Sequence, residues 1–135
     1  MSTNLLGVTL EQSVKYQGRW GQWAWIFHRL SGLGVLLFLT IHIADTSMVY
    51  FYPPLYEEAL KLYKSVPFGV GELLLAAALI YHGLNGIRVA LVDFEPSLTR
   101  YQRPMWVGVW VLFAVGYGIT LGIMVPELLH VAGLV

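Results

Sequence analysis

Polar side chains interrupt residues 77–95, ALIYHGLNGIRVALVDFEP, a stretch that otherwise has the composition of a membrane-spanning helix. His82, Asn85 and Arg88 are each costly in hydrocarbon, and ionisable groups inside a membrane usually serve a function. Helical periodicity places Gly86 on the same face as His82. A glycine one turn from a histidine leaves room for a planar ring system, so His82 is a candidate cofactor ligand.

A second histidine, His42, lies in the preceding apolar stretch, one turn before Asp45. His28 precedes His42 by about four helical turns, so the two share one helix face with Gly32 between them. This face suits a flat cofactor. The structural alternatives are a His–Asp hydrogen bond between helices and close helix packing at Gly32. Buried histidines at two depths on adjacent antiparallel helices favour cofactor ligation over both alternatives.

The absence of cysteine limits the chemistry of these histidines. It excludes disulfides, thiolate-held iron–sulfur clusters and thiol nucleophiles within this chain. Widely separated single imidazoles do not form a zinc site, whereas axial ligation of haem iron needs only one or two imidazoles. The second axial ligand would come from another chain. Haem propionates attract cations, which His28, Arg29 and Arg88 can supply near the membrane interface.

The composition is that of a small membrane protein. The 135 residues suffice for one domain, and 57% of them are hydrophobic while 12% are charged. A soluble domain of this size cannot bury so much apolar surface, which makes a soluble helical bundle the minor alternative. The net charge is zero, so we expect no nucleic-acid partner.

Three apolar stretches are long enough to cross a bilayer as helices, which takes about 20 residues each. We expect an all-α integral membrane protein whose three transmembrane helices form a single membrane-anchor domain over residues 1–135. The helices are expected over residues 30–51, 66–91 and 105–129. Each helix carries polar groups that must not face lipid, so a partner bundle is the simplest place for them. We therefore expect the chain to form half of a larger helical bundle.

Prolines mark the connections between the expected helices. Two prolines beginning at Pro53 end the first helix, and Pro104 suits the first turn of the third. Residues 57–63 can form one or two amphipathic turns. Thr9 and Gln12 have capping-box spacing, which predicts a short helix lying on the membrane before the first span.

Basic residues set the expected orientation. Six of them flank the N-terminal side and the second connection, whereas only Lys61 and Lys64 lie on the other side. The positive-inside rule then places an N-terminal segment of residues 1–28 in the cytoplasm and the C-terminus outside. Four tryptophans gather at the expected cytoplasmic interface: Trp20, Trp23, Trp25 and Trp106.

Two motifs resemble the cytochrome b membrane anchor of succinate:quinone oxidoreductase (succinate dehydrogenase, complex II). They are HRLSG at residues 28–32 and HGLNGIRVALVDF at residues 82–94, which match H-R-x-[ST]-G and H-x3-G-I-R-x4-D-[FY]. The resemblance covers about Trp20 to Trp110. It implies a bacterial or archaeal cytoplasmic membrane, a second membrane-anchor subunit, and an iron–sulfur subunit and a flavoprotein subunit held on the cytoplasmic face.

The resemblance also implies roles for individual residues. His82 corresponds to an axial ligand of haem b, and His28 and Arg29 correspond to residues that meet the propionates. Arg29 would also contribute to a quinone site near the start of the first span. Trp25 stands where the best-known single-haem members have a quinone-binding serine, and Ser31 can supply a hydroxyl instead.

His42 followed by Asp45 resembles the two-haem anchors, in which the first span carries a ligand for a haem nearer the outer surface. Residue counting places His42 past the middle of the bilayer, which agrees with this pattern. We therefore predict two haems b, the inner one bound by His82 and the outer one by His42.

The chain itself has no flavin-binding glycines and no cluster ligands, so the succinate site belongs to another subunit. Its expected tasks are to anchor the enzyme, to form part of a quinone site and to set haem potential through the axial imidazoles. Two alternatives remain open. One is the anchor of a quinol:fumarate reductase, and the other is a haem-free structural membrane subunit whose polar residues only hold helices together.

Overall fold

The computed structural model describes residues 20–134, and in this part of the chain the secondary structure is entirely helical. The helices are α2 (Trp20–Phe51), α3 (Pro53–Tyr63), α4 (Val66–Phe94), the short 3₁₀ helix η1 (Pro96–Tyr101) and α5 (Gln102–Val131). Three segments are long and apolar enough to cross a membrane: Gly21–Phe51, Val66–Phe94 and Pro96–Val131. The predicted all-α fold with three membrane helices is confirmed. The capping box predicted at Thr9 and Gln12 lies outside the described residues.

The membrane helices are longer than the apolar stretches in the sequence. α2 begins at Trp20, before the expected start at residue 30, so no helix boundary separates residues 20–28 from the span. Its 32 residues extend over about 48 Å, whereas the hydrocarbon of a bilayer is about 30 Å thick. The helix ends must therefore reach into the headgroup region or be accommodated by tilt. Hydropathy detects only the part of a helix that faces hydrocarbon.

The ends of the helices follow the local sequence. Pro53 occupies the first turn of α3, where its missing N–H costs nothing, and Pro104 occupies the first turn of α5. Glu95 ends α4, and its carboxylate accepts a hydrogen bond from the backbone N–H of Ser97 at 3.3 Å. Hydrogen bonds from the hydroxyl and N–H of Ser97 hold the pKa of the Glu95 carboxyl below its usual value. The second connection is therefore a defined turn.

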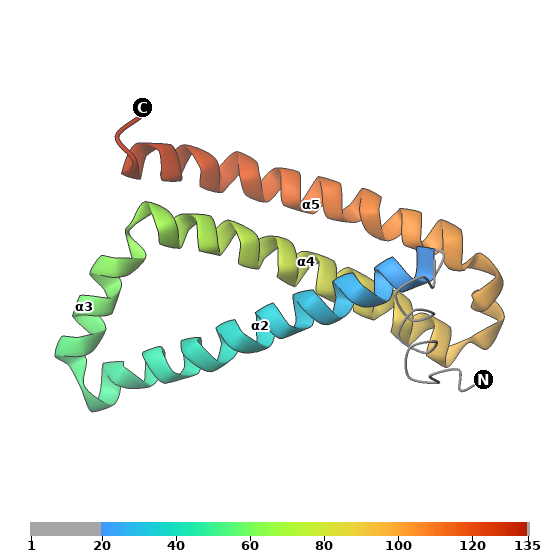
Figure 1. Cartoon of the computed structure of the whole chain (residues 1–135), viewed down its shortest axis with the longest axis horizontal. Helices are drawn as coiled ribbons and strands as arrows, with labels where there is room; N and C mark the ends of the chain where they lie inside the picture. Colours follow the sequence, from blue (N-terminus) through green and yellow to red (C-terminus); the bar gives the residue numbers. More distant parts are fainter. Residues whose placement is uncertain (1–19, 135) are drawn as a thin grey trace, which may run out of the picture.

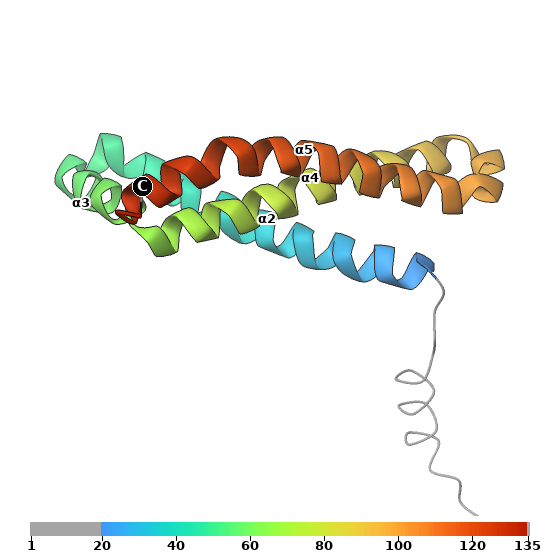
Figure 2. The same ribbon diagram turned by 90° about the horizontal axis from the view of Figure 1, so that it is seen from above.

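α4 lies between α2 and α5 (Figure 1). α4 and α5 run antiparallel and side by side in both views (Figures 1 and 2). α2 packs on α4 near the N-terminal end of α2 and then diverges from it, and α3 bridges the wide end (Figure 1). The contact region of α2 and α4 is thus confined to one part of the molecule, where His28, His82 and Asn85 lie.

α3 is tied to the C-terminal end of α2. The nearby Asp45 carboxylate interacts with the Tyr63 hydroxyl and raises the pKa of Tyr63 above its usual value. The two helices enclose a hollow of about 490 Å³. Nine residues line this hollow: Ile41, Ala44, Asp45, Met48, Leu55, Glu58, Ala59, Leu62 and Tyr63. The predicted amphipathic turns at residues 57–63 are confirmed as part of α3.

Little of the described chain is buried. The buried residues are Ala24, Tyr81, Asn85 and Val109. In the C-terminal half of α2, large side chains such as Leu36 remain about 60% exposed. Apolar surface of this extent is unfavourable in water but not in lipid or against a partner helix. The helices therefore fit a membrane environment with further chains around them.

Candidate functional site

The described chain brings two of the predicted site histidines together. The imidazole rings of His28 on α2 and His82 on α4 stack with their centroids 4.2 Å apart and their planes 3° from parallel. Glycine makes this approach possible, because a Cβ built on Gly32 would lie 2.7 Å from Cε1 of His82. A Cβ on Gly86 would lie 3.6 Å from Cε1 of His28, an ordinary contact. The sequence predicts room for a planar ring system beside Gly86. In the structure the His28 ring lies in part of that space.

One nitrogen of His82 is held by the backbone of α2. Nδ1 lies 3.1 Å from the carbonyl oxygen of His28, and the hydroxyl of Ser31 lies 3.4 Å from the same nitrogen. A carbonyl oxygen only accepts hydrogen bonds, so Nδ1 carries the hydrogen and Nε2 carries the lone pair. Metal-binding histidines are oriented in this way, with one nitrogen bonded to a backbone carbonyl and the other directed at the metal.

Arg88 follows His82 by six residues on α4 and is held by a buried amide. Its guanidinium donates a hydrogen bond from Nη1 to Oδ1 of Asn85 at 3.2 Å. Asn85 is 1% exposed, the most buried polar residue of the described chain. Nε of Arg88 and Nδ1 of His28 are both buried without a hydrogen-bond partner among the described residues. Buried polar atoms of this kind require a partner, and a guanidinium prefers an anionic oxygen.

The role of Asn85 in holding Arg88 is not part of the sequence prediction. The signal for it is the spacing of the two residues, since side chains three positions apart lie on neighbouring parts of a helix surface. The sequence leaves open whether an asparagine at this position bonds within its own helix or across to another. The hydrogen bond from Arg88 shows that Asn85 bonds within its own helix.

The residues predicted to contact quinone are divided between two places. The Arg29 guanidinium lies over the Trp25 ring, 4.2 Å from its centroid, and both side chains are exposed near the start of α2. Ser31 is partly buried on the side that faces α4, and its hydroxyl donates to the carbonyl oxygen of His28 at 3.0 Å. Arg29 and Trp25 thus form one exposed pair, and Ser31 belongs to the histidine pair.

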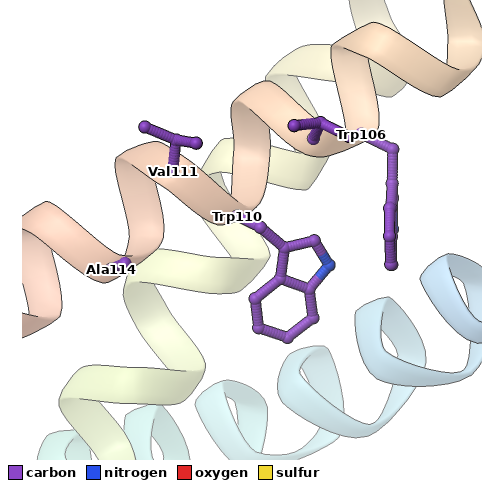
Figure 3. A pocket seen from close by; sticks show the side chains of 5 residues that line it. Trp106, Trp110, Val111 and Ala114 are labelled. Carbon is purple, nitrogen blue, oxygen red and sulfur yellow. The ribbon is translucent and has the colours of Figure 1, made fainter.

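Aromatic side chains fix the helices where the histidines meet. The Trp110 ring of α5 lies 6.1 Å from Phe27 of α2 and 5.5 Å from Tyr81 of α4, measured between centroids. The Tyr81 hydroxyl also donates to the carbonyl oxygen of Ala24 at 3.3 Å. Figure 3 shows the indoles of Trp106 and Trp110 extending from α5 toward α2. Contacts among three helices therefore set the depth and rotation of the His28–His82 pair.

These two indoles also line a shallow hollow of about 380 Å³ on the surface of α5 (Figure 3). The rest of its lining is apolar: Val107, Val111 and Ala114. The hollow is open, so it is part of the surface available to lipid or a partner chain.

His42 lies apart from this cluster. It follows His28 on α2 by about 21 Å of helix rise, so the two histidine positions lie at well-separated depths. The His42 ring is exposed and stacks on Phe38 with centroids 5.3 Å apart. Asp45 faces Tyr63 across the hollow between α2 and α3, so the predicted alternative of a His–Asp hydrogen bond between helices has a competing partner. Over residues 20–134, three or more metal-ligating side chains do not gather at any point.

Comparison with known proteins agrees with the geometry. A family model described as "Succinate dehydrogenase/Fumarate reductase transmembrane subunit" matches residues 11–121. The chain is 41% identical over 115 residues to the "Succinate dehydrogenase 2 membrane subunit SdhC" of Mycobacterium tuberculosis, which covers 83% of this chain and 85% of that protein. It is 30% identical over 95 residues to the "Succinate dehydrogenase hydrophobic membrane anchor subunit" of Halobacterium salinarum, which covers 66% of this chain and 73% of that protein.

Proposed function

Because this chain belongs to the family of transmembrane subunits of succinate dehydrogenase and fumarate reductase, we propose that it holds haem b and lines a quinone site. It is the membrane anchor subunit of an enzyme complex and works with other subunits of that complex. We propose that these are a second anchor subunit, an iron–sulfur subunit and a flavoprotein subunit. The named relatives are both subunits of succinate dehydrogenase, which supports succinate oxidation over fumarate reduction.

The hydrogen bond that Nδ1–H of His82 donates to the carbonyl oxygen of His28 is the observation that carries the haem proposal. It leaves Nε2 with a lone pair, which is the form of imidazole that binds iron. Two stacked histidines without a further ligand do not suit zinc, which needs three or four protein ligands. Haem iron needs only an axial nitrogen from this chain, and the opposite axial ligand can come from the second anchor subunit.

The charged and polar groups around His82 support a place for the haem propionates. Arg88 and His28 each bury a nitrogen that lacks a partner among the described residues. His28 belongs to the histidine pair, and Arg88 lies within two helical turns of His82 on α4. We propose that these two residues and Arg29 bind propionate oxygens through charge-assisted hydrogen bonds. When bound, haem b supplies one-electron redox chemistry, and the task of these residues is to orient it and balance its charge.

We propose that the quinone site includes Arg29 and Trp25. A guanidinium that stacks on an indole keeps its N–H edge available for a hydrogen bond, and the stacking restricts its direction. A quinone oxygen gains negative charge as the ring is reduced, so a positive donor at this point stabilises the reduced form. The pair lies near the predicted cytoplasmic end of α2, where water can supply protons.

For the outer haem we propose His42 as the axial ligand. His42 lies on the face of α2 that carries His28 and Gly32, and this face is directed toward α4 where the helices meet. Beyond that contact α2 diverges from α4 (Figure 1). His42 is exposed. An exposed imidazole in the outer half of a membrane helix is costly unless a ligand or a partner chain covers it. The proposed orientation places the N-terminus in the cytoplasm and the C-terminus outside.

A count of haem in the native complex tests this function. The purified complex should show a reduced-minus-oxidised optical spectrum of b type and about two haems per flavin by pyridine haemochrome titration. A complex that oxidises succinate with quinone but has no haem absorbance would establish the haem-free alternative. A value of about one haem per flavin would agree with the inner site and would refute the proposed outer site.

Replacing Gly32 with alanine should loosen the inner haem. The added Cβ would lie 2.7 Å from the His82 ring, so the ring must move away from α2 and its bond to the His28 carbonyl must lengthen. Loss of a bond to the far nitrogen of a metal-binding histidine typically weakens metal binding by about 10–100-fold. The measurement is the rate at which apomyoglobin extracts haem from the variant complex.

Gly34→Ala provides the matched control, because a Cβ at that position would meet no atom within 4 Å. Both substitutions add the same methyl group to the same helix and give the same gain in helix propensity, about 1 kcal/mol. If the two variants release haem at equal rates, Gly32 does not set the position of His82.

A further inference from the structure

We propose that Ser31 is a positioning residue for His82, and that it does not act as a ligand of quinone. The inference rests on the proposed haem-binding function and adds a residue whose role there is not implied by the axial ligand itself. Ser31 lies on the side of α2 that faces α4, away from the exposed Arg29–Trp25 pair. Its hydroxyl makes two contacts, and both concern the histidine pair.

The first contact decides which way the hydroxyl is oriented. Ser31 Oγ lies 3.0 Å from the carbonyl oxygen of His28, and this oxygen can only accept. The single hydroxyl hydrogen is therefore donated along the helix, a common bond for a serine three residues after the acceptor. The lone pairs of Oγ therefore remain free to accept a hydrogen bond from another group.

The second contact uses those lone pairs. Oγ lies 3.4 Å from Nδ1 of His82, and Nδ1 lies 3.1 Å from the carbonyl oxygen that Ser31 itself contacts. The Nδ1–H group therefore points between two acceptors, the stronger being the carbonyl and the weaker the hydroxyl. A ring with one acceptor can swing about that bond, whereas a second acceptor restricts the rotation.

The backbone at Gly32 and the stacked ring of His28 limit the remaining movement. The His82 ring lies against Gly32, where a built Cβ would be 2.7 Å from Cε1, and the parallel His28 ring lies 4.2 Å away. Residues 28–32 thus surround the His82 imidazole. His28 contributes its carbonyl oxygen and its flat ring, Ser31 its hydroxyl, and Gly32 the space left by its missing side chain. The geometry assigns the HRLSG segment to the support of the axial ligand.

Removal of the Ser31 hydroxyl should change the electronic character of the His82 imidazole, whereas His82 should still bind the haem. An Nδ1–H group that is bonded to acceptors makes the imidazole a stronger base and favours ferric iron. Ser31→Ala should therefore raise the midpoint potential of the inner haem. At a fixed ambient potential, the ferric-to-ferrous ratio should fall by about threefold to tenfold, while haem per flavin stays constant.

The experiment uses the intact complex and three substitutions. Ser31→Ala is compared with Ser31→Thr, which keeps the γ-hydroxyl, and with Ser47→Ala. Ser47 donates to the carbonyl oxygen of Ala44 at 2.6 Å with the same three-residue spacing on the same helix, but lies at an exposed position. Redox titration of the reduced band and the low-spin electron paramagnetic resonance spectrum are recorded for each. A shift for Ser31→Ala alone is the expected result.

Three results would overturn the proposal. The first is a Ser31→Ala complex whose potential and resonance spectrum equal those of Ser47→Ala. The second is an unchanged haem with a raised KM for quinone, which would return Ser31 to the quinone site. The third is a shift of equal size in Ser31→Thr. If Ser31→Ala does not assemble, the isosteric pair Ser31→Thr and Ser31→Val decides by the same readouts. Absence of haem from the parental complex would instead refute the proposed function.

Discussion

Replacement of His82 with alanine is expected to remove the inner haem and to lower the haem content from about two per flavin to about one. In the proposed site the His82 imidazole would be this chain's ligand to the iron, and neither the Ser31 hydroxyl nor the Asn85 amide is a usual haem ligand that could replace it. The variant complex should still reach the membrane, since the apolar contacts of α2, α4 and α5 do not involve the imidazole ring alone. Pyridine haemochrome titration, together with a measurement of flavin, gives the number of haems per flavin.

Exogenous imidazole separates loss of the ligand from loss of the fold. Truncation at His82 leaves a space bounded by the His28 ring and the backbone at Gly32, and free imidazole fits such a space. Titration of imidazole into the His82→Ala complex should restore the reduced band in a saturable way. Full absorbance in the untreated variant would show that His82 only joins two helices and would support the haem-free alternative for the inner site.

The architecture of the membrane helices was predictable because it depends on properties that are local in sequence. Apolar length defines a span, and prolines such as Pro53 and Pro104 end or begin helices wherever they occur. The ends of the spans were less predictable. Residues 20–28 are rich in tryptophan and polar groups, so the apolar stretch in the sequence does not include them, although they are helical and continuous with α2.

The histidine site was predictable in its components and not in its contacts. Motif and depth single out His82, His28 and Arg88, but whether two rings stack depends on how α2 and α4 are rotated against each other. That rotation comes from packing at Phe27, Tyr81 and Trp110, three residues far apart in the chain. A pattern along one helix carries no information about it.

Ser31 illustrates the same limit. The hydroxyl of a serine two residues after Arg29 could bind a quinone or another polar group. The sequence alone does not distinguish these roles. The spacing from His28 does contain a signal, because a serine can bond to the carbonyl three residues earlier and thereby turn toward the same helix face. The face on which this residue lies becomes meaningful only when α4 is known to pass beside it.

Replacement of His42 with alanine is expected to remove the outer haem and again to leave about one haem per flavin. The lost haem should be spectroscopically distinct from that lost in His82→Ala, because the two ligands have different neighbours: His28 and Ser31 for the inner site, Phe38 for the outer. His130→Ala is the matched control, since His130 is an exposed histidine at the end of α5. An unchanged haem content in His42→Ala would refute the two-haem proposal and leave the inner site unaffected.

The separation of the two histidines makes the double variant decisive. His82 stacks on His28, and His42 lies about 21 Å further along α2, so one iron cannot be bound by both. Effects of substitutions at this distance are expected to add. His42→Ala combined with His82→Ala should then retain no haem, while each single variant retains the haem bound by the other histidine. Loss of both haems in either single variant would mean that the substitution disturbs assembly of the bundle, because a ligand acts only on the haem that it binds.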